Sequence, residues 1–154
     1  MSEVAGLIPT SLAGQARALL SGQSDRIANA ANLASLLFHE LENVNWAGFY
    51  FMRGGELIVG PFQGKPACVC IPLGKGVCGT AAASREAQLV SDVHAFDGHI
   101  ACDADSRSEI VVPLIHNGEV LGVLDLDSPT KGRFDESDLS LLQEIAEIYL
   151  ASID

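Results

Sequence analysis

Residues 109–128, EIVVPLIHNGEVLGVLDLDS, constrain the fold more than any other stretch of this chain. Two runs rich in valine, isoleucine and leucine flank the pair Asn117-Gly118. An Asn-Gly pair between apolar runs favours the tight turn of a β-hairpin. The stretch therefore predicts two antiparallel strands that are neighbours in a sheet.

Shorter strands are expected on either side of a helical segment in the middle of the chain. They are NWAGFYFM (45–52), GGELIVGPF (54–62), ACVCIPL (67–73) and AQLVSDV (87–93), with a helical turn in GKGVCGTAAASRE (74–86). Longer helices are expected in 10–22, in 24–44 after an N-cap at Ser24, and in the C-terminal segment after an N-cap at Asp135. The apolar stripe of the second helix is expected to be Ile27, Ala31, Ala34, Leu37, Phe38 and Leu41.

This order of elements predicts an α+β fold with a central antiparallel sheet. The helices pack on one face, and loops that cover a ligand lie on the other, with residues 92–108 as a lid over a cavity floored by the sheet. A single domain is expected over residues 1–154, with N-terminal helices in 10–43, the sheet and active-site loops in 44–130, and the C-terminal helix in 135–153.

The charge balance excludes two classes of partner. The formal net charge is −11, whereas nucleic acids and anionic membranes are bound by clustered lysine and arginine. No stretch has the form of a signal peptide, and no apolar run approaches membrane-spanning length. A cytoplasmic location is expected, with the four cysteines as thiols rather than a disulfide framework.

Asp125 and Asp127 are unusual because aspartate is depleted in strands. Spaced two apart, they share a face of the strand, either as an acidic wall that accepts an ammonium group or as a strand end in solvent. Glu109 joins them only in one register. A two-residue turn at Asn117-Gly118 puts Glu109 opposite Leu126 and turns it away, whereas a three-residue turn puts it opposite Asp125.

Trp46, Gly48 and Tyr50 alternate along NWAGFY and therefore share a face. Two aromatic rings with polar tips around a glycine gap suit a small ligand with a methyl group or a cation. Ordinary core aromatics are the competing interpretation.

The cysteines occupy three different settings. Cys78 begins a helix of small residues and is expected to be a buried structural thiol, while Cys68 and Cys70 are expected to share a face of one short strand. Cys102 lies in the polar loop HAFDGHIACDADSRSEI (94–110), where a thiolate is exposed and reactive. His94, His99 and Cys102 lack the compact paired spacing of structural zinc sites, so no metal is expected.

Five motifs together resemble the free methionine-(R)-sulfoxide reductases, a family built on the GAF domain. They are NWAGFY, GPFQGKPAC, IPLGKGVCGTA, DVHAFDGHIACDADSRSEIVVPL and GVLDLDSP with GRFDESD, and the likeness runs from about residue 35 to the C-terminal helix. The FDGHIACDADSRSEI segment is specific to this family, whereas GVLDLDS also suits other GAF domains.

The resemblance implies a role for each thiol. Cys102 is the nucleophile, Cys68 resolves the intermediate and Cys78 is a third thiol near the site. Cys70 is not part of the family motif and competes with Cys68 for the resolving role. The family pattern also implies the residues of the substrate pocket, which are Trp46, Tyr50, Glu109, Asp125 and Asp127. It therefore favours the register that turns Glu109 inward.

The expected reaction converts free L-methionine-(R)-sulfoxide to methionine without a bound cofactor. Cys102 becomes a sulfenic acid, a second thiol condenses with it to a disulfide, and thioredoxin reopens the disulfide. The family also implies a homodimer. The alternatives are a non-enzymatic GAF module that binds a small ligand, which is usually fused to output domains, and a thiol redox sensor, which needs no acidic pocket.

Overall fold

The centre of the molecule is a curled sheet, seen in a computed structural model that describes residues 11–98 and 104–153. In chain order the elements are α2 (Leu12–Leu20), α3 (Arg26–Glu40), β1 (Trp46–Arg53), β2 (Glu56–Gly64), β3 (Cys70–Pro72), α4 (Gly76–Ser84), β4 (Gln88–Val90), a 3-10 turn (Val93–Ala95), β5 (Ser108–His116), β6 (Glu119–Ser128) and α5 (Glu136–Ser152). The six strands follow the order β3-β2-β1-β6-β5-β4, and every neighbouring pair is antiparallel. The expected α+β architecture with a central antiparallel sheet is confirmed.

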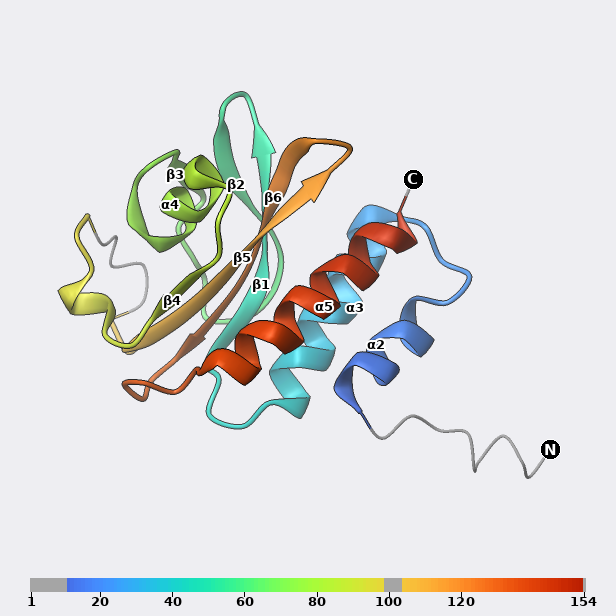
Figure 1. The fold of residues 1–154 in the computed structure, drawn as a ribbon, viewed down its shortest axis with the longest axis horizontal. Helices are drawn as coiled ribbons and strands as arrows, with labels where there is room; N and C mark the ends of the chain where they lie inside the picture. Colours follow the sequence, from blue (N-terminus) through green and yellow to red (C-terminus); the bar gives the residue numbers. More distant parts are fainter. Residues whose placement is uncertain (1–10, 99–103, 154) are drawn as a thin grey trace.

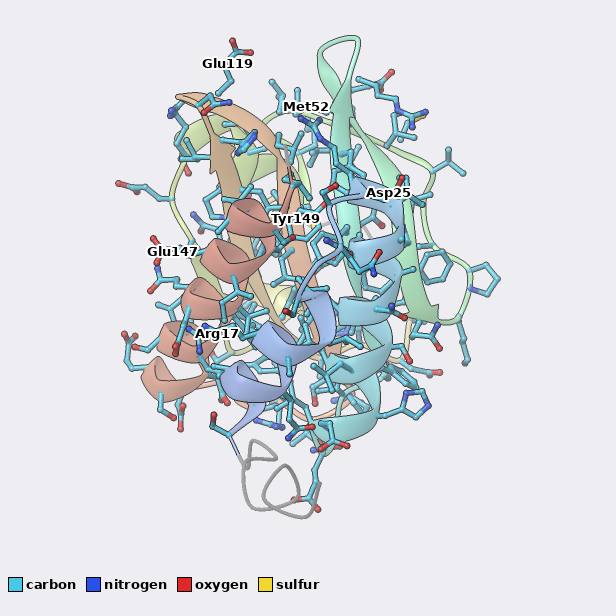
Figure 2. All side chains as sticks on the ribbon, turned by 90° about the vertical axis from the view of Figure 1, so that its right-hand side faces the viewer. Arg17, Asp25, Met52, Glu119, Glu147 and Tyr149 are labelled. Atoms are coloured by element: carbon cyan, nitrogen blue, oxygen red, sulfur yellow. The ribbon has the colours of Figure 1, made fainter. Side chains whose placement is uncertain are left out.

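The two faces of the sheet have different partners because side chains alternate along each strand. Ala47, Phe49 and Phe51 of β1 belong to a core cluster with residues of α2, α3 and α5. Figure 1 shows these three helices together on one side of the sheet, and Figure 2 shows them in front of it. Tyr149 of α5 is fully buried there, and its ring packs on Phe49 with centroids 4.9 Å apart.

The opposite face is covered by α4 and by loops. Val77, Cys78, Ala81 and Ala82 of α4 form a second buried cluster with Trp46, Tyr50 and other residues of the sheet. In Figure 1, α4 lies on the side of the sheet away from α5. The expected division into a helical face and a loop face therefore holds with one exception, since the short helix α4 belongs to the loop side.

The β5–β6 hairpin has the expected turn and an unexpected bulge. Asn117 and Gly118 both have positive φ and connect His116 directly to Glu119, as a two-residue turn requires. Leu121 is then an extra residue on β6, because Ile115 lies opposite Val120 while Leu114 lies opposite Gly122. Both expected registers are wrong: Glu109 lies opposite Asp127, on the same face as Asp125.

The N-caps of α3 and α5 and the buried face of α3 can be compared with the predictions from the sequence. Asp135 caps α5 as expected, in a capping box with Asp138, but α3 is capped by Asp25 rather than Ser24. The buried side of α3 matches the expected stripe only in part, since Ala34 and Leu37 are buried and Phe38 and Leu41 pack against the core. Ile27 and Ala31 are exposed, and the buried residues are Asn29, Ala30, Leu33, Ala34 and Leu37.

One of the buried residues of α3, Asn29, is polar. Its amide donates to the carbonyl of Gln23 and to the hydroxyl of Ser152, both at 2.9 Å, so a polar residue is satisfied in a buried position.

Within the described ranges, no helix is both long enough and apolar enough to cross a membrane.

Candidate active site

A cavity of about 50 Å³ lies between the sheet and α4. Six of the residues predicted to carry the function line it, and they come from four different elements: Trp46 and Tyr50 from β1, Cys78 from α4, Glu109 from β5, and Asp125 and Asp127 from β6. The sheet therefore gathers residues that lie as much as 81 positions apart in the sequence, from 46 to 127.

The three carboxyl groups converge because of the hairpin register. Glu109 lies opposite Asp127, and Asp125 lies two residues earlier on β6 with its side chain on the same face. Asp125 is only 3% exposed and Glu109 is 9% exposed, which rules out the interpretation of Asp125 as a strand end in solvent.

Burial raises the pKa of Glu109 well above its usual range, and the neighbouring charges of Asp125 and Asp127 raise it further. Burial also raises the pKa of Asp125. Two buried carboxyl groups in contact resist simultaneous ionisation, so the pair retains a proton at a pH where exposed carboxyl groups have lost theirs. The Oδ1 atom of Asp125 is buried and has no hydrogen-bond partner among the described residues.

Trp46 and Tyr50 form one wall of the cavity. Their rings stack with centroids 5.7 Å apart, and Trp46 also stacks on Phe62 at 5.1 Å. The indole Nε1 of Trp46 donates to the backbone oxygen of Lys65 at 3.1 Å. Burial raises the pKa of Tyr50, with Asp125 as the next cause, so its hydroxyl remains protonated.

Gly48 does not leave the gap for a ligand that the alternation suggested. A Cβ atom at this position would collide with the side chain and backbone of Phe62 on β2. Glycine is needed there so that the neighbouring strand can approach closely.

Cys78 points into the acidic cluster. Its Sγ atom donates to Oε2 of Glu109 at 3.8 Å, and it is buried as expected. Burial raises the pKa of the Cys78 thiol well above its usual range, and Asp125 and Glu109 add to the shift. Cys78 is therefore a protonated thiol in this state rather than a reactive thiolate.

Cys68 and Cys70 do not share a face of one strand, contrary to expectation. The strand β3 begins only at Cys70, which is exposed and lies opposite Ile58. Cys68 precedes the strand, is half-buried and packs against the cluster that contains Trp46 and Cys78. Cys70 and Cys78 are free thiols, and Cys68 is not among the free thiols of the described residues.

Cys102 and His99 lie outside the described residues, and the described residues on either side of them make two contacts with the rest of the fold. The backbone nitrogen of Gly76 donates to the oxygen of Gly98 at 2.9 Å, which ties the start of the loop to α4. At the other end, Lys65 pairs with Asp105 at 2.8 Å. Gly76 and Ser106 both line the cavity, so described residues on both sides approach it. His94, by contrast, does not line the cavity.

Two residues at the N-terminal end of α4 also belong to the site and were not predicted from the sequence. Lys75 and Gly76 line the cavity, and no side chain caps the helix at Lys75. The backbone N–H groups at a helix start favour an anion. The GKG motif before the helix was the available signal. Ser106 also lines the cavity and was not predicted.

Comparisons with known proteins agree on one family. Residues 28–154 match the GAF domain family. The free methionine-R-sulfoxide reductase of Escherichia coli is 52% identical over 132 residues, which cover 85% of this chain and 80% of that protein. The enzyme of the same name from Saccharomyces cerevisiae is 47% identical, over 84% of this chain and 77% of that one.

A solved structure with the same architecture contains a ligand. The free methionine-R-sulfoxide reductase from Neisseria meningitidis, determined in complex with its substrate, is 43% identical to this chain. It superimposes with a TM-score of 0.89 over 92% of this chain and 85% of that one.

Proposed function

Since this chain belongs to the free methionine-(R)-sulfoxide reductase family of GAF domain proteins, we propose that its pocket reduces free L-methionine-(R)-sulfoxide to L-methionine. The observation that carries this proposal is the convergence of Glu109, Asp125 and Asp127 on one small cavity. Such a cluster is unfavourable unless it binds a proton or a cation, and a free amino acid brings an ammonium group.

The carboxyl groups have two tasks in the proposed reaction. Ionised carboxylates pair with the substrate ammonium, and the unpartnered Oδ1 of Asp125 is a suitable acceptor. One carboxyl group also has to deliver a proton to the sulfoxide oxygen. Glu109 is our candidate for this acid, because burial and two neighbouring acids both favour its protonated form.

The substrate carboxylate has a complementary partner in the lining of the same cavity. Lys75 is the cationic side chain among the described residues that line the cavity, and it precedes the uncapped start of α4. A carboxylate placed there is stabilised by the lysine charge and by the helix N-terminus. The pocket thus offers opposite charges to the two ends of an amino acid.

Cys102 performs the redox step in this proposal. Its thiolate attacks the sulfoxide sulfur while the oxygen is protonated, which forms a sulfur–sulfur bond. The hydroxyl then passes from the substrate sulfur to the Cys102 sulfur as that bond breaks, so methionine leaves and Cys102 becomes a sulfenic acid. The Cys68 thiol then attacks the sulfur of Cys102, which forms a disulfide and releases water. Thioredoxin is the proposed external dithiol; it exchanges with that disulfide and returns both thiols to the reduced state.

The positions of the other cysteines support Cys68 as the resolving thiol. Cys68 packs on the pocket side of the sheet, whereas Cys70 lies exposed on the edge strand β3. Cys78 is within the pocket but is held as a thiol by burial and by the surrounding acids.

Single-turnover assays on three serine variants test these roles. Cys102→Ser should form no methionine, because a hydroxyl is a poor nucleophile toward sulfur. Cys68→Ser should form about one methionine per active site and then stop, since the sulfenic acid has no partner. Cys70→Ser is the matched control and should turn over normally with thioredoxin. Normal turnover by Cys68→Ser, or a single turnover by Cys70→Ser, would reassign the resolving thiol.

A further inference from the structure

We propose that Cys78, Glu109 and Asp125 also form a binding site for a thiophilic divalent cation, Zn²⁺, and that the bound ion excludes the amino-acid substrate. The proposal of a metal site depends only on the geometry of the three residues. The exclusion rests on the proposed function, because it assumes that the substrate ammonium occupies the same carboxylates.

The distances in the cluster fit a small metal ion. One ligand atom from each of the three residues lies within 4.8 Å of the other two. The Sγ atom of Cys78 is 3.8 Å from Oε2 of Glu109. A tetrahedral zinc ion, with bonds of about 2.3 Å to sulfur and about 2.1 Å to oxygen, holds two such atoms about 3.6 Å apart. A movement of a few tenths of an ångström would therefore complete these two bonds.

An unpartnered atom gives an independent reason to place a cation in the cluster. Asp125 is 3% exposed and lines the cavity, and its buried Oδ1 has no hydrogen-bond donor among the described residues. A buried carboxylate oxygen without a partner is costly, and an ion within the cluster would satisfy it. The thiol proton now donated to Glu109 would be released when sulfur binds the metal.

The ligand types select the class of metal. Calcium and magnesium prefer an all-oxygen shell, whereas a thiolate favours zinc and similar soft ions. Three protein ligands leave a fourth position, which faces the cavity of about 50 Å³ and can hold a water molecule. The three ligands lie on α4, β5 and β6, which pack against one another, so the site is formed by the folded core rather than by a loop.

Binding is tested without catalysis in a variant that retains only the proposed thiol ligand. In Cys68→Ser/Cys70→Ser/Cys102→Ser, titration with Co²⁺ as a spectroscopic substitute should give a thiolate-to-cobalt charge-transfer band that saturates at one ion per chain. Zn²⁺ should displace the Co²⁺ and abolish the band. Glu109→Gln and Asp125→Asn in this background should each weaken Co²⁺ binding at least tenfold, whereas Glu119→Gln, at an exposed hairpin position, should not.

Absence of the band, or equal Co²⁺ affinities for the Glu109→Gln and Glu119→Gln variants, would overturn the metal site. An increase in the melting temperature of the triple-serine variant on addition of Zn²⁺ provides a second readout, since a ligand of the folded state stabilises it. No shift would count against the site.

The exclusion is tested in the same triple-serine variant, which cannot turn over. Addition of free methionine-(R)-sulfoxide should lower the intensity of the cobalt charge-transfer band, because the substrate displaces the ion. N-acetyl-methionine-(R)-sulfoxide should leave the intensity unchanged. A cobalt band that free substrate leaves unchanged would overturn the exclusion and leave the metal site standing. Failure of the wild-type protein to reduce methionine sulfoxide would instead contradict the proposed function.

Discussion

Glu109 is a carboxyl group that folding places where ionisation is unfavourable. Its pKa is higher in the folded protein than in the unfolded chain, mainly because of burial and then because of Asp125 and Asp127. The folded state therefore keeps a proton that the unfolded chain releases. The stability gained from this proton is complete below the ordinary pKa of glutamate, about 4.3, and is lost as the pH rises through the folded pKa.

This linkage predicts the effect of Glu109→Gln on stability in the absence of substrate. An amide cannot ionise, so the variant should lose less stability than the wild type as the pH rises from about 5 to about 8. Urea denaturation across that range measures the difference. Glu119→Gln, at an exposed position, is the control and should follow the wild-type curve. Parallel curves for wild type and Glu109→Gln would contradict the raised pKa.

Individual site residues differed in how far the sequence could place them. The family motif named Cys102, Cys68, Cys78, the aromatics and the acids. Cys102 lies outside the described residues, and all the others except Cys68 line one cavity. Residue spacing alone misplaced Cys70 beside Cys68, because two-residue periodicity holds only inside a strand and β3 begins at Cys70. Lys75 was missed because its position at the cavity depends on where α4 starts.

At the scale of elements, the β5–β6 hairpin decides whether the acidic pocket exists. The sequence predicted both strands and the turn, since an Asn-Gly pair has a strong local preference. It did not predict the extra residue Leu121, and that bulge is what turns Glu109 toward Asp127. A bulge depends on close packing with other strands, here β1, and so has no local signal apart from the adjacent Gly122.

Gly122→Ala tests how tightly this region of β6 is packed. A Cβ atom there would collide with the backbone oxygen of Tyr50 on β1, so the substitution should cost about 3 kcal/mol of stability. Gly54→Ala is the control: Gly54 has φ of 59° with nothing within 4 Å, and the substitution should cost only about 1 kcal/mol of backbone strain. Urea denaturation measures both, and equal losses would contradict the close approach of β1 and β6.

At the scale of the whole molecule, the two faces of the sheet differ: one packs against helices in an apolar core, and the other carries the candidate active site. The helical face is an apolar core with α2, α3 and α5, which the amphipathic patterns of the sequence predicted in outline. The other face carries the cavity, the acids and α4, and the sequence patterns alone did not place α4 there. Buried polar residues interrupt the apolar pattern of the strands on that face. Because such residues do not favour folding, they indicate where a functional site lies.

In the proposed function, this pocket recognises a free amino acid with one configuration at sulfur. The most direct test measures methionine formation from free L-methionine-(R)-sulfoxide, its (S) epimer and N-acetyl-L-methionine-(R)-sulfoxide, with thioredoxin as the reductant. We expect kcat/KM for the free (R) epimer to exceed the other two at least about a hundredfold, because the buried acids need the ammonium group and the site has a fixed handedness. Equal reduction of the two epimers, or reduction of the N-acetyl compound as fast as the free amino acid, would contradict the account.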